Sequence, residues 1–262
     1  MAGFSLTIDY SSFSSLDQYA LLACQDHNYG NSSDWFGTFR GGLYGMYSRL
    51  QAVTQHYYDV HAWKLEPRIL ANAEYHLSVI FFGMDSAIEC LTFALNALGN
   101  AIEASLFHDV TDDRALRKVS PSDILGRSNK RPLPGYAKYF PELQTHWQSE
   151  IFLIDTIMTQ HDVSKHRQTI FRGGQSRNDP PPGFYEAAGV ADDKLKILLA
   201  PMKEIRLGRD PKAPQIARIP TPHSDRLTVE SICESFAAFI NQSGHLALSD
   251  ATTRIHVSKT PT

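Results

Sequence analysis

The densest cluster of side chains able to exchange protons or hold phosphate is the seven-residue segment 161–167. It contains two histidines, one aspartate, one lysine and one arginine, in the order His161-Asp162-Val163-Ser164-Lys165-His166-Arg167. Histidine titrates near neutral pH, and lysine and arginine supply positive charge for a phosphate group. Metal-free cleavage of RNA needs a base for the ribose 2′-hydroxyl, an acid for the leaving oxygen and a cation for the charged phosphorane. The structural alternative is that these residues cap a helix end, where cations bond the last carbonyls.

A second polar feature crosses the most apolar stretch of the chain. Asp85 and Glu89 are four residues apart and therefore share one helical face, and Thr92 and Asn96 continue the stripe. Paired carboxylates can orient a histidine, pair with an arginine or hold a cation, or they can form a solvent-facing strip. We predict that this stripe lies near segment 161–167 and not in bulk water.

These two segments resemble the HEPN family of helical domains. The family motif consists of Arg, a polar residue (Asn, Asp or His), three variable residues and His. Residues 161–166 are similar to it, with Asp162 as the polar residue, His166 as the terminal histidine and His161 where the motif has Arg. HEPN helices also carry an Ala-rich stretch with one glutamate, which residues 86–91 around Glu89 resemble.

The resemblance implies a homodimer in which motif histidines of two subunits meet in a cleft that cuts RNA without a metal. Other members bind RNA or a nucleotide, or serve as interaction modules, so a non-catalytic structural or interaction protein of the same fold is the alternative. A role as a toxin, or in defence or stress response, is also implied. The candidate catalytic residues are His166, His161 and Asp162, the candidate substrate-binding residues are Lys165, Arg167 and Arg172, and the supporting residues are Glu89 and Asp85.

Metal-dependent phosphohydrolases of the HD type are a distant alternative, because His-Asp dipeptides occur at 108–109 and 161–162. The sequence contains no GxxxxGK[ST], GxSxG or HExxH motif, no GxGxxG after a strand, and no Glu followed three residues later by His. The cysteines, Cys24, Cys90 and Cys233, are odd in number and widely spaced, which argues against a zinc cluster or a disulfide framework and favours a reducing compartment. We therefore expect neither a metal nor a cofactor.

Composition favours a globular protein with two oppositely charged halves. Of the 262 residues, 42% are hydrophobic, enough for a substantial core. Residues 1–113 have 4 Lys/Arg and 13 Asp/Glu, a balance of −9, whereas residues 114–262 have 21 and 15, a balance of +6. The basic run 114–138 could contact RNA phosphates, although a solvated loop is the simpler interpretation. The first residues lack a secretory signal and the apolar stretch 77–98 contains charged groups, so we expect a cytoplasmic protein without membrane contact.

A mainly α-helical bundle of four or more helices must position these side chains. Apolar residues recur at helical spacing after Gly41-Gly42, over 68–106, after Pro141 and from about Thr228. The helix after Pro141 is expected to bury one face, made of Leu143, Trp147, Ile151, Ile154 and Met158. We expect an irregular lead-in with one short helix over 1–40, a helical core over 41–175, and a Pro-rich extended or short-strand segment over 176–225 that could bind a protein partner. A helix over 226–250 then packs on the bundle, and 251–262 form a tail.

Overall fold

The computed structural model describes residues 6–26, 29, 32–63, 70–126, 131–166 and 229–255. In this part the chain forms nine α-helices and no strand, which confirms the mainly α fold. The Pro-rich segment 176–225, Arg167, Arg172 and the tail from residue 256 lie outside the described residues, and so do the side chains of Lys165 and His166.

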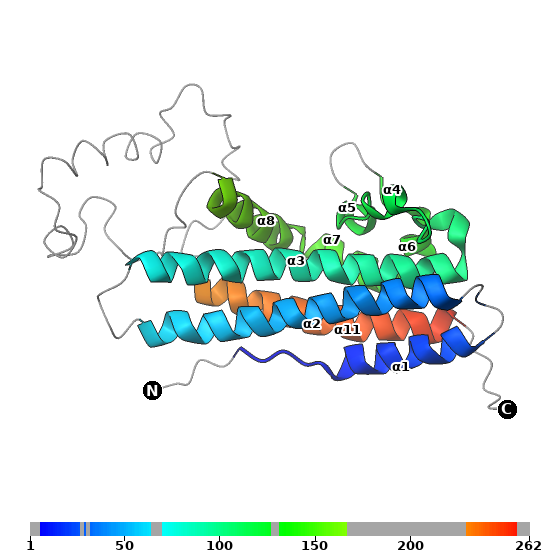
Figure 1. The fold of residues 1–262 in the computed structure, drawn as a ribbon, viewed down its shortest axis with the longest axis horizontal. Helices are drawn as coiled ribbons and strands as arrows, with labels where there is room; N and C mark the ends of the chain where they lie inside the picture. Colours follow the sequence, from blue (N-terminus) through cyan, green and yellow to red (C-terminus); the bar gives the residue numbers. More distant parts are fainter. Residues whose placement is uncertain are drawn as a thin grey trace, which may run out of the picture. The chain divides into compact units, whose positions relative to one another are not determined.

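Two long helices, α2 (Ser32–Trp63) and α3 (Leu70–Ile102), run antiparallel along each other and frame the bundle (Figure 1). Their apolar faces meet in the core, as the helical spacing predicts. The fully buried residues on these faces include Leu43, Met46, Leu50, Val53, Leu77, Ile80, Met84 and Leu91. A Cβ atom on Gly42 would lie only 2.7 Å from the backbone nitrogen of Ala94, so the close approach of the two helices requires glycine there.

Four further helices complete the bundle: α1 (Ser11–Gln25), α7 (Pro141–Ser149), α8 (Ile151–His166) and α11 (Val229–Arg254). Helix α1 packs against α2 and α11, α11 packs against α7, and α8 packs against α3 (Figure 1). In the described residues between α3 and α7 the helices are short: η2 (Ala104–Leu106), α4 (Asp113–Leu116), α5 (Ser122–Leu125) and α6 (Pro134–Tyr139).

The N-terminal region is more regular than its composition suggests. Helix α1 and the start of α2 occupy most of the segment 1–40, which was expected to be mainly irregular. Phe13 and Leu16 of α1, and Trp35 and Phe39 of α2, are buried in the core. The free energy gained by burying these side chains outweighs the weak helix propensity of the surrounding Ser, Asp and Gly residues.

The helix expected after Pro141 is in fact two helices, which meet at Glu150. The backbone of Glu150 leaves the helical conformation, with φ −99° and ψ 14°. This break shifts the register of the buried face, so Ile151 is 37% exposed whereas Leu153 and Ile157 are buried. The prediction that Ile151 lies on the buried face was wrong because a helical pattern does not reveal a one-residue interruption.

The last helix also differs from its expected bounds. Helix α11 passes through Asp250, where it was expected to end, and continues to Arg254. Asp250 is buried, and its Oδ2 accepts hydrogen bonds from the backbone N–H groups of Glu142 and Leu143, at 3.1 and 3.0 Å. This carboxylate therefore caps the first turn of α7, which explains a buried acid inside a helix.

The segment Tyr75–Ile102 of α3 has the length and hydropathy of a membrane span, with a mean hydropathy of 1.5 over its most apolar window. However, 61% of that window is buried inside the protein, and Thr92 and Asn96 of the same segment are fully buried. Burial against the other helices explains the apolar composition of α3, which is a core helix of the bundle.

Candidate acid–base site

The polar stripe of α3 meets the 161–167 segment at one short contact. The Nδ1 atom of His161, on α8, lies 2.6 Å from the Oδ2 atom of Asp85. The two side chains are only 14% and 9% exposed. An ionised carboxylate can only accept a hydrogen bond, so Nδ1 carries the proton and the lone pair of a neutral ring is on Nε2. A carboxylate that fixes the tautomer and orientation of a histidine in this way prepares it for acid–base catalysis.

The second carboxylate oxygen of Asp85 is unusual. Its Oδ1 atom is buried and makes no hydrogen bond with the described residues. Leaving a buried polar group without a partner costs about 1–3 kcal/mol. The packing of α8 on α3 does not require this cost, because an apolar side chain in place of Asp85 would fill the same space without an unpaired polar atom. Asp85 is therefore a candidate for a functional role, and not only for a structural one.

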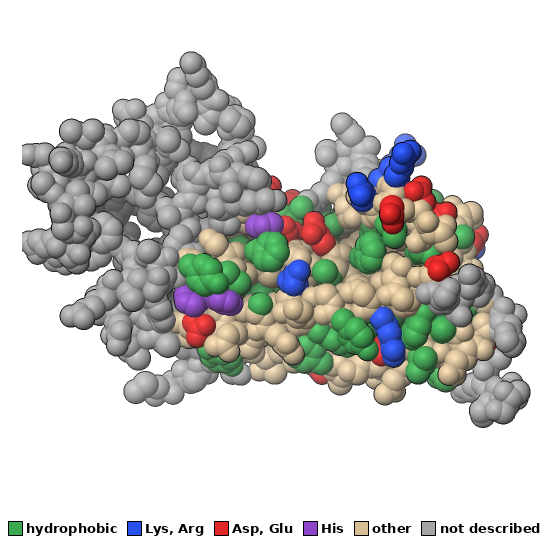
Figure 2. Space-filling model, viewed as in Figure 1, with side chains coloured by type: hydrophobic (Ala, Val, Ile, Leu, Met, Phe, Trp, Pro, Cys, Tyr) green, Lys and Arg blue, Asp and Glu red, His purple; other side chains and the backbone are tan. Residues whose placement is uncertain are grey.

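An aromatic ring and a cation lie beside the Asp85–His161 pair. Phe82, one turn before Asp85, is 45% exposed, and its ring lies edge-on to the His161 ring at 5.4 Å between centroids. The guanidinium carbon of Arg49, on α2, lies 5.7 Å from the centre of the same phenyl ring. Its Nε donates a hydrogen bond of 3.2 Å to the hydroxyl of Ser86. Basic, apolar and histidine side chains are accordingly adjacent on the face formed by α2, α3 and α8 (Figure 2).

Sequence reasoning missed Arg49 and gave Phe82 no functional role. Arg49 is 37 residues from Ser86 along the chain, and only the antiparallel packing of α2 on α3 brings them together. Phe82 lies three residues before Asp85, on the adjacent turn of the same helix, but its exposure is seen only in the structure.

The predicted proximity of the stripe and the 161–167 segment holds for Asp85. Glu89, one turn further along α3, is exposed, so the prediction that the stripe lies away from bulk water was wrong for this residue. Asp162 is exposed as well. The resemblance implies Asp162 as the orienting partner of His166, whose side chain lies outside the described residues, so that role stays a prediction. The carboxylate that bonds to His161 is Asp85, on α3. The reason is geometric, because neighbouring residues of a helix point about 100° apart and α8 presents His161, not Asp162, to α3.

The other His-Asp dipeptide, His108-Asp109, is held in place by hydrogen bonds to neighbouring residues. The backbone N–H and carbonyl of His108 are both bonded to the side chain of Asn96, at 3.0 Å each. The His108 Nε2 atom lies 3.3 Å from the fully buried Asp123, and the exposed Asp109 accepts bonds from Thr111. Among the described residues, neither dipeptide belongs to a group of three ligand atoms close enough to share one metal ion. Nothing in this geometry supports the HD-type alternative.

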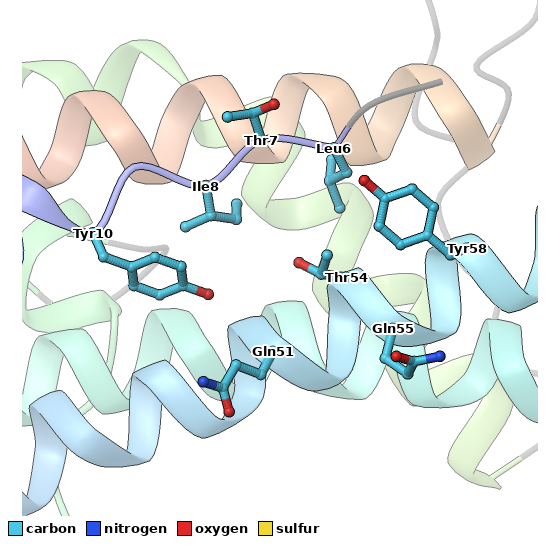
Figure 3. A pocket seen from close by; sticks show the side chains of 8 residues that line it. All are labelled: Leu6, Thr7, Ile8, Tyr10, Gln51, Thr54, Gln55 and Tyr58. Atoms are coloured by element: carbon cyan, nitrogen blue, oxygen red, sulfur yellow. The ribbon is translucent and has the colours of Figure 1, made fainter. Parts of the chain in front are cut away.

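A separate groove of about 500 Å³ lies between residues 6–10 and α2 (Figure 3). Its polar lining consists of hydroxyl and amide groups, among them Tyr10, Gln51 and Thr54. Burial raises the pKa of the Tyr10 phenol, which removes it further from neutral titration. Without a carboxylate, histidine or amine side chain in its described lining, the groove is a poor candidate for acid–base chemistry.

No protein-family model, curated protein or solved structure matches this chain. The relationship to HEPN domains therefore remains a hypothesis carried by residues 86–91 and 161–166. Any function has to be argued from the chemistry of the Asp85–His161 pair and its neighbours.

Proposed function

We propose that this protein is a HEPN-like helical protein that binds RNA and cleaves it without a metal, with His161 as an acid–base group. The observation that carries the proposal is the 2.6 Å contact between His161 Nδ1 and the buried carboxylate of Asp85. This contact gives the imidazole a defined tautomer, which a solvated surface histidine lacks. The adjacent phenyl ring can stack on a base of the RNA, and the adjacent guanidinium can bind a phosphate.

In the proposed reaction, Nε2 of His161 removes the proton of a ribose 2′-hydroxyl, whose oxygen attacks the adjacent phosphorus. The bond from phosphorus to the 5′-oxygen breaks, and a second acid protonates that leaving oxygen, so the products are a 2′,3′-cyclic phosphate and a 5′-hydroxyl. His166 is the proposed second acid. Arg49 stabilises the charge of the phosphorane, and Phe82 stacks against a base. Lys165, Arg167 and Arg172 remain proposed phosphate contacts.

The proposal includes a cytoplasmic homodimer that acts as a toxin or in a defence or stress response. Free cysteines support a reducing compartment, since Cys24, Cys90 and Cys233 form no disulfide. The HEPN resemblance supports the dimer, because its active cleft is built from the motif histidines of two subunits. Light scattering coupled to size-exclusion chromatography tests the dimer directly, and a monomeric mass at assay concentration would contradict this part of the proposal.

The test of the activity is cleavage of single-stranded RNA by the purified protein in the presence of a chelator. We expect His161→Ala and His166→Ala to reduce the cleavage rate by about 10²–10⁴-fold, the range for loss of an acid–base group. His245→Ala is the matched control, because His245 is a more exposed histidine on another helix. Product analysis should find a 2′,3′-cyclic phosphate.

Binding is tested separately by fluorescence anisotropy with a labelled oligoribonucleotide. Phe82→Ala should weaken binding, whereas Phe152→Ala should not, although the two phenylalanines are 45% and 41% exposed. Loss of one base–aromatic contact corresponds to about 1–3 kcal/mol, or roughly 5- to 150-fold in affinity. Equal affinity of the two variants, or cleavage that requires a metal or persists in His161→Ala, would refute the ribonuclease proposal.

The second candidate is a non-catalytic structural or interaction protein of the same fold. The observation that favours it is the low exposure of His161, since a side chain that is 14% exposed gives a substrate little access. In that case the Asp85–His161 pair fixes α8 on α3, and its removal lowers stability while no RNA is bound or cleaved by the wild-type protein.

A further inference from the structure

Two histidines and an aspartate meet at the end of α2 and the beginning of α3. The Nδ1 atom of His56 lies 2.6 Å from the Nδ1 atom of His76, and the latter lies 3.8 Å from Oδ2 of Asp59. One ligand atom from each of the three residues lies within 4.8 Å of the others. Histidine and acidic side chains are visible together at this end of the two helices (Figure 2).

The side chains belong to the class of ligands that divalent transition metals prefer. Imidazole nitrogens and a carboxylate oxygen suit zinc and its neighbours, and sites with three protein ligands leave a fourth position for water or substrate. Two nitrogens bound to one tetrahedral zinc ion lie about 3.3 Å apart, given Zn–N bonds of about 2.0–2.1 Å. The imidazoles of His56 and His76 therefore need to separate by less than about 1 Å, within the reach of side-chain rotation.

The surroundings of the cluster support its ligands. Burial, and after it the neighbouring His76, lowers the pKa of His56, whereas Asp59 acts in the opposite direction. Gln55 donates a hydrogen bond of 3.1 Å to Oδ1 of Asp59, which orients the other carboxylate oxygen. Such a bond to a ligating carboxylate is the usual support for a metal ligand. The cluster is half-buried, with Asp59 35% and His76 13% exposed, so ions have access to it.

We propose that His56, Asp59 and His76 form a binding site for a divalent transition-metal ion, with zinc as the representative ion, that ties the end of α2 to the start of α3. This inference goes beyond the proposed ribonuclease function, whose site shares no residue with the cluster. The sequence did not reveal it, because His76 is 20 residues from His56 and the two meet only through the packing of α2 on α3. The simpler explanation is a hydrogen-bonded histidine pair beside an acid, and it predicts that the cluster does not bind zinc.

The experiment is a calorimetric titration of the metal-free full chain with Zn²⁺ at about pH 7.5, above the ordinary histidine pKa. We expect one ion per chain. His56→Ala, His76→Ala and Asp59→Asn should each weaken binding by at least about 100-fold, and Gln55→Ala by roughly tenfold, because it removes only a supporting hydrogen bond. His245→Ala should leave the affinity unchanged. The visible spectrum of the Co²⁺-substituted protein should indicate low-symmetry four- or five-coordination that the ligand variants lack.

A stability measurement gives a second readout. Zinc at about 100 times its dissociation constant should raise the Tm of the wild-type protein by roughly 5–10 °C, and should not raise that of His76→Ala. Far-UV circular dichroism establishes that each metal-free variant is folded, and His56→Gln, which keeps the side-chain volume, replaces His56→Ala if that variant is not. Absence of zinc binding by the wild-type chain, or equal binding by all variants, would overturn the proposal. RNA cleavage in the presence of chelator is independent of this result, so failure of one proposal does not decide the other.

Discussion

Removing the carboxylate of Asp85 and the imidazole of His161, singly and together, measures how strongly these two side chains are coupled. Both are largely buried, at 9% and 14% exposure, and their contact is 2.6 Å long. A hydrogen bond to a charged group contributes about 1.5–3 kcal/mol, whereas exposed ion pairs contribute only about 0.2–1 kcal/mol. We expect a coupling free energy in the first range, because solvent screens this pair little.

The single substitution Asp85→Ala should be less harmful than that coupling suggests. It breaks the bond to His161, but it also removes the buried Oδ1 atom, which has no hydrogen bond with the described residues. Removal of this unpaired buried atom regains about 1–3 kcal/mol of the stability that is lost with the bond. The net loss in the free energy of unfolding should therefore be at most about 2 kcal/mol, equivalent to a decrease in Tm of no more than roughly 8 °C for a chain of this size.

Urea denaturation of the wild-type protein, Asp85→Ala, His161→Ala and the double variant, followed by far-UV circular dichroism, yields the coupling free energy. The contact of His161 with Phe82 is lost in both variants that lack the histidine, so it cancels from the cycle. A coupling below about 0.5 kcal/mol would place the pair among ordinary surface contacts. In that case Asp85 would not orient His161, and the acid–base proposal would lose its physical basis.

Three changes elsewhere in the α2–α3 pair test its packing and electrostatics. Asn96→Ala removes a fully buried amide that makes two hydrogen bonds of 3.0 Å to the backbone of the loop after α3, so the free energy of unfolding should fall by about 2–4 kcal/mol in urea denaturation. Gly42→Ala should destabilise the protein by about 1–2 kcal/mol in thermal melts, because its Cβ would meet the backbone of Ala94. The matched control is Gly41→Ala, which has open space around its Cβ and should stabilise the protein by up to about 1 kcal/mol. A stabilised Gly42→Ala variant would refute the packing argument. The pKa of His56 is lowered in the folded state, so its contribution to stability is present above the unfolded pKa of about 6.5 and is lost as the pH falls through the folded value. With chelator present, wild-type stability should therefore decrease more steeply below pH 6.5 than that of His56→Gln, and parallel curves would contradict this assignment.

The core faces of α2 and α3 could be predicted from the sequence because burial of an amphipathic helix leaves a direct trace in the spacing of apolar residues. The same reasoning failed at Ile151, where a break at Glu150 shifts the register of the buried face. It also failed for the start of α2, where polar and glycine residues are held in a helix by the burial of Trp35 and Phe39. In both cases tertiary packing overrode the local pattern.

The sequence by itself determined the fold class, the polar stripe on α3 and the concentration of titratable groups at 161–167, because these depend on neighbours along the chain. Only the tertiary structure decided that Asp85 is the carboxylate that bonds His161, and that Arg49 and Phe82 lie beside the pair. It also decided that His56 and His76 meet. The physical reason is that contacts between helices depend on their crossing and register, which are set by the packing of the whole core and leave no periodic signal in the residues that make them.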